Sequence, residues 1–121
     1  MSARPYRAKL ENNNKWVEGN YLHLNDGLEC ELDIIVDAAG QYKRIDPETL
    51  GECTGYTDTL GRLVFEGDIV KDDEDTYIIE YNAEWATFIG QRIAEITFKY
   101  LSEIKGEIIG NVHEKQTELG V

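Results

Sequence analysis

Metal chemistry is the first chemistry that the residue types suggest, because the chain contains two histidines and two cysteines. Structural zinc sites take their ligands from closely spaced pairs, such as two cysteines separated by two to four residues. Neither the cysteines nor the histidines of this chain form such a pair. We therefore expect ordinary core thiols and surface imidazoles, with no bound metal or other cofactor. The four residues are His23, Cys30, Cys53 and His113.

An acidic run at Asp72-Asp73-Glu74-Asp75 supplies the oxygen ligands that calcium and magnesium prefer. Calcium loops also need a glycine for their sharp turn and further ordered ligands beyond it. The run lacks both, so we expect a solvated hairpin tip. Because the chain has 24 acidic residues, nothing singles out a catalytic pair. A carboxylate-based, metal-dependent hydrolase is kept only as an alternative.

The sequence contains few residues that could act as catalytic nucleophiles. Ser2 and Ser102 are the only serines, and neither lies in the G-x-S-x-G pattern that exposes a nucleophile at a strand-to-helix turn. The glycine patterns of P-loops and of dinucleotide-binding folds are also absent from the sequence. We expect that the protein is not an enzyme.

The net charge of −12 disfavours partners that carry phosphates. Nucleic acids and anionic membranes attract surfaces rich in lysine and arginine. The acidity lies mainly in the middle of the chain, whereas residues 1–15 are basic. The acidic middle either keeps the protein soluble or forms a face for a basic partner, including one that normally holds nucleic acid.

Four aromatic residues in the second half could stack on nucleobases, as in small-barrel nucleic-acid-binding proteins. Their neighbours, residues 72–75 with Glu80 and Glu84, are acidic and would repel a phosphate backbone. Core packing is the preferred interpretation, and direct nucleic-acid binding through the basic N-terminus remains an alternative. The four residues are Tyr77, Tyr81, Trp85 and Phe88.

Short alternating segments separated by turn residues indicate a mainly β chain with short antiparallel strands. A helical turn is expected at 46–50, with Asp46 as its cap and Pro47 in its first position. Residues 91–104 fit both helix and strand periods, and their composition favours a strand followed by a short turn at 101–104. The other expected strands are 5–10, 15–24, 28–36, 41–45, 52–57, 63–65, 68–71, 76–81 and 107–112.

The segment 28–36 shows the clearest alternation. Leu28, Cys30, Leu32 and Ile34 are expected on one face of this strand, and Glu29, Glu31 and Asp33 on the other.

Three blocks of the sequence resemble the YopX family. The opening block is YRAKL at 6–10 with KWVEGNY at 15–21, and the closing block is EIIGNVHE at 107–114. The central block is IDPETLGECTGYTD at 45–58, followed by Gly61 and by VFEGDIVK at 64–71. The three blocks agree in order along nearly the whole chain. The chain departs from the usual family residues at Glu52, Cys53, Thr59, Leu60 and His113.

The resemblance implies a β-rich protein encoded by a phage or prophage, in a family without an established biochemical activity. The segment 66–70 followed by 77–81 also looks like the start of a small SH3-like barrel. We therefore expect one domain over residues 1–121, with a hairpin subdomain at 1–50 and a barrel-like subdomain at 51–113.

The candidate binding residues are family-motif positions beside apolar strands, and their role is open. They are Glu66, Gly67, Asp68 and Asn111. A second set is expected to form turns, since glycine accepts a left-handed backbone and aspartate caps its own turn. This set is Gly55, Asp58, Gly61 and Gly110.

These observations together predict an accessory protein that acts by protein–protein interaction through an acidic surface. A basic host factor in the cytoplasm of the bacterial host is the expected partner, and self-association is a further expectation. No apolar run is long enough for a membrane span or a signal peptide, so we expect no membrane partner.

Overall fold

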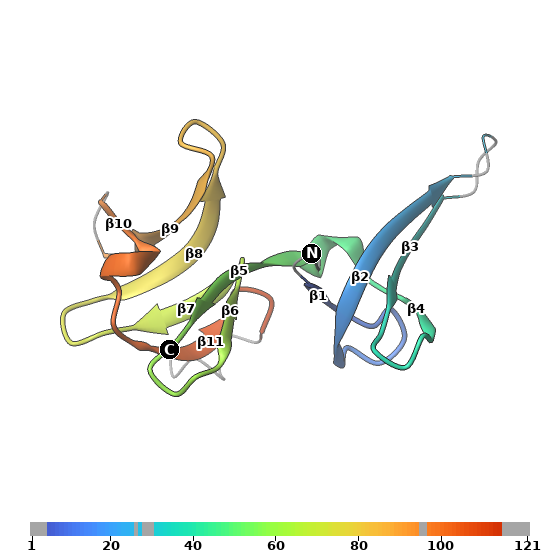
Figure 1. Cartoon of the computed structure of the whole chain (residues 1–121), viewed down its shortest axis with the longest axis horizontal. Helices are drawn as coiled ribbons and strands as arrows, with labels where there is room; N and C mark the ends of the chain where they lie inside the picture. Colours follow the sequence, from blue (N-terminus) through green and yellow to red (C-terminus); the bar gives the residue numbers. More distant parts are fainter. Residues whose placement is uncertain (1–4, 26, 28–30, 95–96, 115–121) are drawn as a thin grey trace. The chain divides into compact units, whose positions relative to one another are not determined.

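The computed structural model describes residues 5–25, 27, 31–94 and 97–114, which form β-strands, two 3₁₀ turns and loops (Figure 1). The chain divides into two compact units, residues 1–53 and residues 54–121. Every strand pairing in both units is antiparallel among the described residues. The prediction of a mainly β protein with short antiparallel strands is confirmed, and the prediction of a single domain stays a prediction.

The first unit is a meander whose strands lie in the order β4-β3-β2-β1, with β1 pairing on its other side with the start of β5. Its core contains Ala8, Ile35 and Ile45, all almost wholly buried. Four partly buried side chains pack against this core: Tyr6, Val17, Tyr21 and Leu50. The strands are β1 (Tyr6–Lys9), β2 (Trp16–Asn25), β3 (Glu31–Val36), β4 (Tyr42–Arg44) and β5 (Gly51–Thr57).

The alternation predicted for β3 holds, and each of its two faces carries a buried isoleucine. Ile35 lies on the same face as Asp33, opposite Tyr21 of β2, and is wholly buried. On the other face, Ile34 is 3% exposed, although Leu22 opposite it is exposed. Residues 28–30, which were also assigned to these faces, lie outside the described residues.

The predicted helical turn is confirmed as η1 (Pro47–Thr49). The Asp46 side chain accepts a hydrogen bond from the Glu48 N–H at 3.1 Å, as an N-cap does. The Thr49 hydroxyl accepts a hydrogen bond of 2.8 Å from the backbone N–H of Lys9. This bond ties the turn to β1, so a local capping motif also becomes part of the packing of the first unit.

The second unit is built around a five-stranded sheet in the order β10-β9-β8-β7-β11. Its core contains Val64, Val70, Ile79, Phe88 and Leu101, with Ile104 and Ile108 packed against them. The end of β5 lies beside β6 (Leu63–Phe65). The sheet strands are β7 (Asp68–Lys71), β8 (Thr76–Asn82), β9 (Thr87–Arg92), β10 (Phe98–Tyr100) and β11 (Glu107–Asn111).

The predicted SH3-like barrel is not confirmed, because this sheet is open. Within the described residues, β10 is one edge and β11 is the other, and the two edges do not pair. The chain leaves β10 after three residues, and the 3₁₀ turn η2 (Leu101–Glu103) directs Leu101 into the core. The strand is therefore too short to continue around a barrel.

The ambiguous segment 91–104 is resolved in favour of strand and turn. Phe98–Tyr100 is a strand and Leu101–Glu103 is the short turn that was expected. Residues 95 and 96 lie outside the described residues. Strand β9 at Thr87–Arg92 was not predicted, and it supplies the pairing partner of both β8 and β10.

Candidate functional site

The predicted binding residues Asp68 and Asn111 form a buried hydrogen-bonded pair. Asp68 is 1% exposed, and its Oδ2 accepts a bond of 2.8 Å from the Phe65 N–H. Its Oδ1 accepts a bond of 3.0 Å from Nδ2 of Asn111, whose own Oδ1 accepts a 2.9 Å bond from the N–H of His113. The two residues are also opposite each other in the β7–β11 register. Their polar atoms therefore hold the β6–β7 turn against β11.

Gly67 completes this turn because its backbone is in the left-handed region, with φ of +92°. Its N–H donates to the Ile79 carbonyl at 2.7 Å, and its carbonyl accepts from the Val112 N–H at 2.9 Å. A Cβ at this position would lie 3.4 Å from the Asn111 amide, an ordinary contact distance, so the backbone conformation and not a lack of space favours glycine here. Glu66 beside it is half-buried.

Asp58 organises the turn between β5 and β6. Its Oδ1 accepts from the N–H groups of Leu60 at 3.0 Å and Arg62 at 2.8 Å. Its Oδ2 accepts from Arg62 Nε and from the Ile108 N–H on β11, both at 3.0 Å. Burial opposes ionisation, but the bonds from Ile108 and Arg62 outweigh it and lower the pKa of Asp58.

The three remaining glycines of the predicted set lie at backbone irregularities. Gly55 and Gly61 have φ of +85° and +82°, which favours glycine over other residues. Gly110 follows the register shift between Ile108 and Gly110, where β11 bulges against β7. The geometry at each position suits a turn or bulge residue.

The acidic turn, residues 72–75, joins β7 to β8 and is folded by its own backbone. Asp72 Oδ1 accepts from the N–H groups of Glu74 and Asp75, both at 2.8 Å, and the Asp72 N–H donates to the Asp75 carbonyl at 3.0 Å. An aspartate that bonds the next backbone amides is typical of a tight turn.

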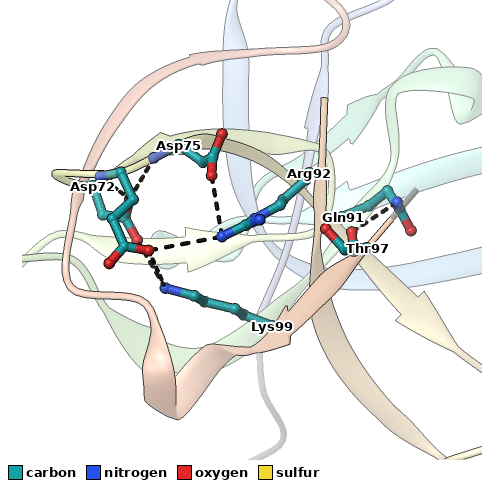
Figure 2. Close-up of polar contacts among 7 residues, drawn as sticks. Asp72, Asp75, Gln91, Arg92, Thr97 and Lys99 are labelled. Atoms are coloured by element: carbon teal, nitrogen blue, oxygen red, sulfur yellow. Dashed lines mark hydrogen bonds and ion pairs between the residues drawn. The ribbon is translucent and has the colours of Figure 1, made fainter. Parts of the chain in front are cut away.

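Two cations from β9 and β10 point toward the acidic turn (Figure 2). Arg92 Nη2 lies 3.1 Å from Asp75 Oδ2 and 3.7 Å from Glu74 Oε2. Lys99 Nζ lies 3.4 Å from Glu74 Oε2 and 3.7 Å from Asp72 Oδ2. The predicted solvated tip is therefore an ion-paired turn, and the ion pairs connect it to the edge strand β10. Sequence reasoning missed both cations because they lie far along the chain from the acidic run.

Strand β10 carries two aromatic side chains on the sheet face opposite to that of Lys99. Because side chains alternate along a strand, Phe98 and Tyr100 point away from the face on which Lys99 meets the acidic turn. The rings of Phe98 and Tyr100 are 5.6 Å apart, and the Trp85 ring lies 4.7 Å from that of Phe98. We call these three residues the aromatic face. Their exposed fractions are 46% for Trp85, 37% for Phe98 and 46% for Tyr100.

The four aromatic residues singled out from the sequence separate into two classes. Tyr77 and Phe88 are buried, as core packing requires, whereas Tyr81 and Trp85 are each 46% exposed. The Tyr81 ring meets the Phe88 ring edge-on at 5.2 Å. Phe98 and Tyr100 were not singled out from the sequence, although the strand expected in this segment places both on one face, because side chains alternate along a strand.

A family model for the YopX protein matches residues 5–119. The chain belongs to the YopX family. The match includes all three blocks whose resemblance was noted in the sequence, and it contains both structural units apart from their outer ends. A comparison with curated proteins finds no match.

The zinc-type residues that the structure describes, His23, Cys53 and His113, do not form a metal site. Among the described residues, no group of three histidine, cysteine, aspartate or glutamate side chains has a geometry that could hold a metal ion. Cys53 is buried in the first unit, and Cys30 lies outside the described residues. No helix in the described part of the chain is long and apolar enough to cross a membrane.

His23 has a different partner, the carboxylate of Asp33. Its Nδ1 lies 2.8 Å from Asp33 Oδ1, which also accepts a 2.5 Å bond from the Tyr21 hydroxyl. The hydrogen bond between His23 and Asp33 raises the pKa of His23. The hydrogen bond that Tyr21 donates to Asp33 raises the pKa of Tyr21 to about 12. The bonds from Tyr21 and His23 lower the pKa of Asp33. Tyr21, His23 and Asp33 thus form a hydrogen-bonded cluster of ionisable side chains on the β2–β3 hairpin. The sequence alone did not predict this cluster.

Proposed function

We propose that this YopX-family protein is a phage or prophage accessory protein that acts by binding a basic protein of the bacterial host in the cytoplasm. The second unit supplies the binding surface, and the role is binding and not catalysis. The observation that carries the proposal is the charge of this unit: its described residues include twelve acidic and five basic side chains.

The basic side chains of the second unit are largely engaged with its own carboxylates. Arg62 pairs with Asp58 at 2.9 Å, while Arg92 and Lys99 pair with the acidic turn. Several other carboxylates remain exposed, so the unit presents a negative surface that attracts a basic partner and speeds its encounter. These exposed residues are Asp73, Glu80, Glu84, Glu103 and Glu107.

The same charges disfavour direct nucleic-acid binding by the second unit, because a phosphate backbone would be repelled. In the first unit, Arg7 and Lys9 lie over the Trp16 ring, at 4.5 Å and 5.4 Å from its centre. Part of the basic N-terminal segment is therefore engaged with an aromatic side chain of the protein itself. Binding of a basic protein is therefore the function that these contacts favour.

The test is affinity capture from a bacterial lysate with the tagged protein, washed at low and at high salt. A fourfold neutralised variant of the second unit carries Asp73→Asn, Glu80→Gln, Glu84→Gln and Glu107→Gln. Its matched control neutralises four exposed glutamates of the first unit, at Glu11, Glu18, Glu31 and Glu48. We expect the wild type and the control to retain a basic protein at low salt, and the second-unit variant to lose it.

Retention of nucleic acid in place of protein, or equal capture by all three proteins, would overturn the proposal. Sedimentation of the purified protein over a range of concentrations tests self-association separately. A concentration-dependent dimer that persists in the second-unit variant would place the self-contact outside the acidic surface.

A further inference from the structure

The aromatic face presents three partly exposed rings in one cluster on the second unit. The contacts of Trp85 with Phe98 and of Phe98 with Tyr100 hold the rings against one another. Clustered exposed apolar side chains on a small soluble protein are typical of interaction sites, whereas single exposed rings are ordinary. Two of the rings, Phe98 and Tyr100, lie on the edge strand β10, where a partner can approach without displacing another strand.

One carboxylate shares the sheet face of these rings, and a second precedes Trp85 in the chain. In the strand register, Glu80 of β8 is opposite Ile89 of β9, and Ile89 is opposite Tyr100 of β10. Side chains opposite each other in a register point to the same face, so Glu80 shares its face with Tyr100. Glu84 directly precedes Trp85 in the β8–β9 turn and is exposed.

The cations of β9 and β10 are on the other face. Arg92 and Lys99 point toward the acidic turn, and Lys99 Nζ lies 5.7 Å from the ring centre of the buried Tyr77. Within the described part of the chain, no cation–π contact is formed by Trp85, Phe98 or Tyr100. The rings and carboxylates of the aromatic face are thus arranged like a binding site for a cation that the second unit does not itself supply.

The first unit contains a cation–π contact between its own residues, Arg7 and Trp16. There the Arg7 guanidinium carbon lies 4.5 Å from the centre of the Trp16 ring, within the range of a cation–π interaction. The comparison indicates what would complete the aromatic face: a planar guanidinium stacked on a ring and bonded to a carboxylate. Arginine suits this role better than lysine because its planar group can do both.

We propose that the aromatic face binds arginine side chains of a basic protein partner, with Trp85 as the stacking ring and Glu80 as the anionic contact. The inference rests on the proposed function, since it names the chemistry by which such a partner is recognised. In this proposal the aromatic face recognises arginine, and the remaining exposed carboxylates attract any basic protein through their charge.

The test titrates the full chain with a capped peptide of alternating glycine and arginine, followed by NMR. The two tryptophan indole N–H signals are separate reporters. We expect the Trp85 signal to shift with the peptide, and the Trp16 signal to stay, because Arg7 already lies over its ring. The same peptide with citrulline in place of arginine keeps the shape and loses the charge, and it should not bind.

Two variants with matched controls locate the contact. Trp85→Ala should weaken peptide binding about fivefold or more, as expected for a cation–π contact with an accompanying apolar contact. Tyr42→Ala, which removes a ring that is 70% exposed in the first unit, should leave binding unchanged. Glu80→Gln should weaken binding about threefold, whereas Glu48→Gln, at an exposed position of the first unit, should not. Circular dichroism confirms that each variant is folded.

Equal losses in Glu80→Gln and Glu48→Gln, binding of the citrulline peptide, or a shift of Trp16 without Trp85 would each overturn the inference. Failure of the proposed function is distinguishable from these results. If wild type and Trp85→Ala capture the same basic protein equally, the aromatic-face inference fails and the proposed function stands. If neither captures one, the proposed function fails, and the peptide titration decides the aromatic face independently.

Discussion

Asp68 and Asn111 are 43 residues apart in the chain and share a buried hydrogen bond of 3.0 Å between β7 and β11. The carboxylate of Asp68 at the same time accepts the N–H of Phe65, so one side chain closes a turn and joins two strands. Both residues belong to blocks by which the YopX family resemblance was noted. Their first physical role is to hold the second unit together.

We predict that Asn111→Ala destabilises the second unit by roughly 2 kcal/mol, because it removes a donor from a buried carboxylate. Urea unfolding followed by Trp85 fluorescence, in a Trp16→Phe background, measures the effect in this unit. Asn12→Ala, in an exposed turn of the first unit, is the control and should change stability by less than about 0.5 kcal/mol. Comparable effects of the two substitutions would contradict the structural role.

Asp58 should make the second unit acid-sensitive. Its pKa is lowered in the folded state, so its stabilisation is complete above the ordinary value of 3.8 and is lost as the pH falls through the folded pKa. Asp58→Ala should cost about 3 kcal/mol at neutral pH, since four N–H donors lose their acceptor.

The same variant should show a shallower loss of stability between about pH 5 and pH 2 than the wild type. Asp72, whose pKa is also lowered, accounts for part of the acid sensitivity that remains. Parallel stability curves for the wild type and Asp58→Ala over this range would argue against the pKa shift of Asp58.

Lys99 connects β10 to the acidic turn through ion pairs that are partly open to solvent, so its contribution should depend on salt. Lys99→Gln should lower the melting temperature slightly at low ionic strength, and the difference from the wild type should shrink in 1 M salt. Lys105→Gln removes an exposed lysine outside the turn and serves as control. An effect of Lys99→Gln that is unchanged by salt would point to packing and not to charge.

The His23–Asp33–Tyr21 cluster should respond as a unit to removal of its shared carboxylate. The Asp33→Asn variant should lower the pKa of His23 toward its ordinary value of 6.5, because the hydrogen bond to a charged acceptor is lost. NMR titration of the His23 ring measures this shift. His23 contributes stability below the unfolded pKa, and this contribution is lost as the pH rises through the raised folded value.

Tyr21 gives an independent reading of the same variant. In the wild type its phenol should titrate near pH 12, and in Asp33→Asn it should titrate at lower pH, as measured by ultraviolet absorption. Glu18→Gln, on an exposed position of the same strand, is the charge-matched control. An unchanged Tyr21 titration in Asp33→Asn would show that the 2.5 Å bond does not set its pKa.

The sequence by itself determined the local structure of this protein. The helical turn at Asp46 and Pro47, the turn at Asp58 and the strand at Thr76–Asn82 all depend on backbone preferences of neighbouring residues. Such preferences act over a few positions and can be read directly from residue order. Membership of the YopX family could be predicted for the same reason, because the three sequence blocks that resemble the family are short local patterns.

Only the tertiary structure decided which residues meet. Ile35 of β3 belongs to the core of the first unit, although it shares a face with Asp33, because the strands beside it place Tyr21 opposite and Ala8 in the same core. The acidic turn is ion-paired because β9 and β10 bring Arg92 and Lys99 to it. Burial and charge pairing depend on contacts between distant segments, and a one-dimensional pattern does not specify which segments become neighbours.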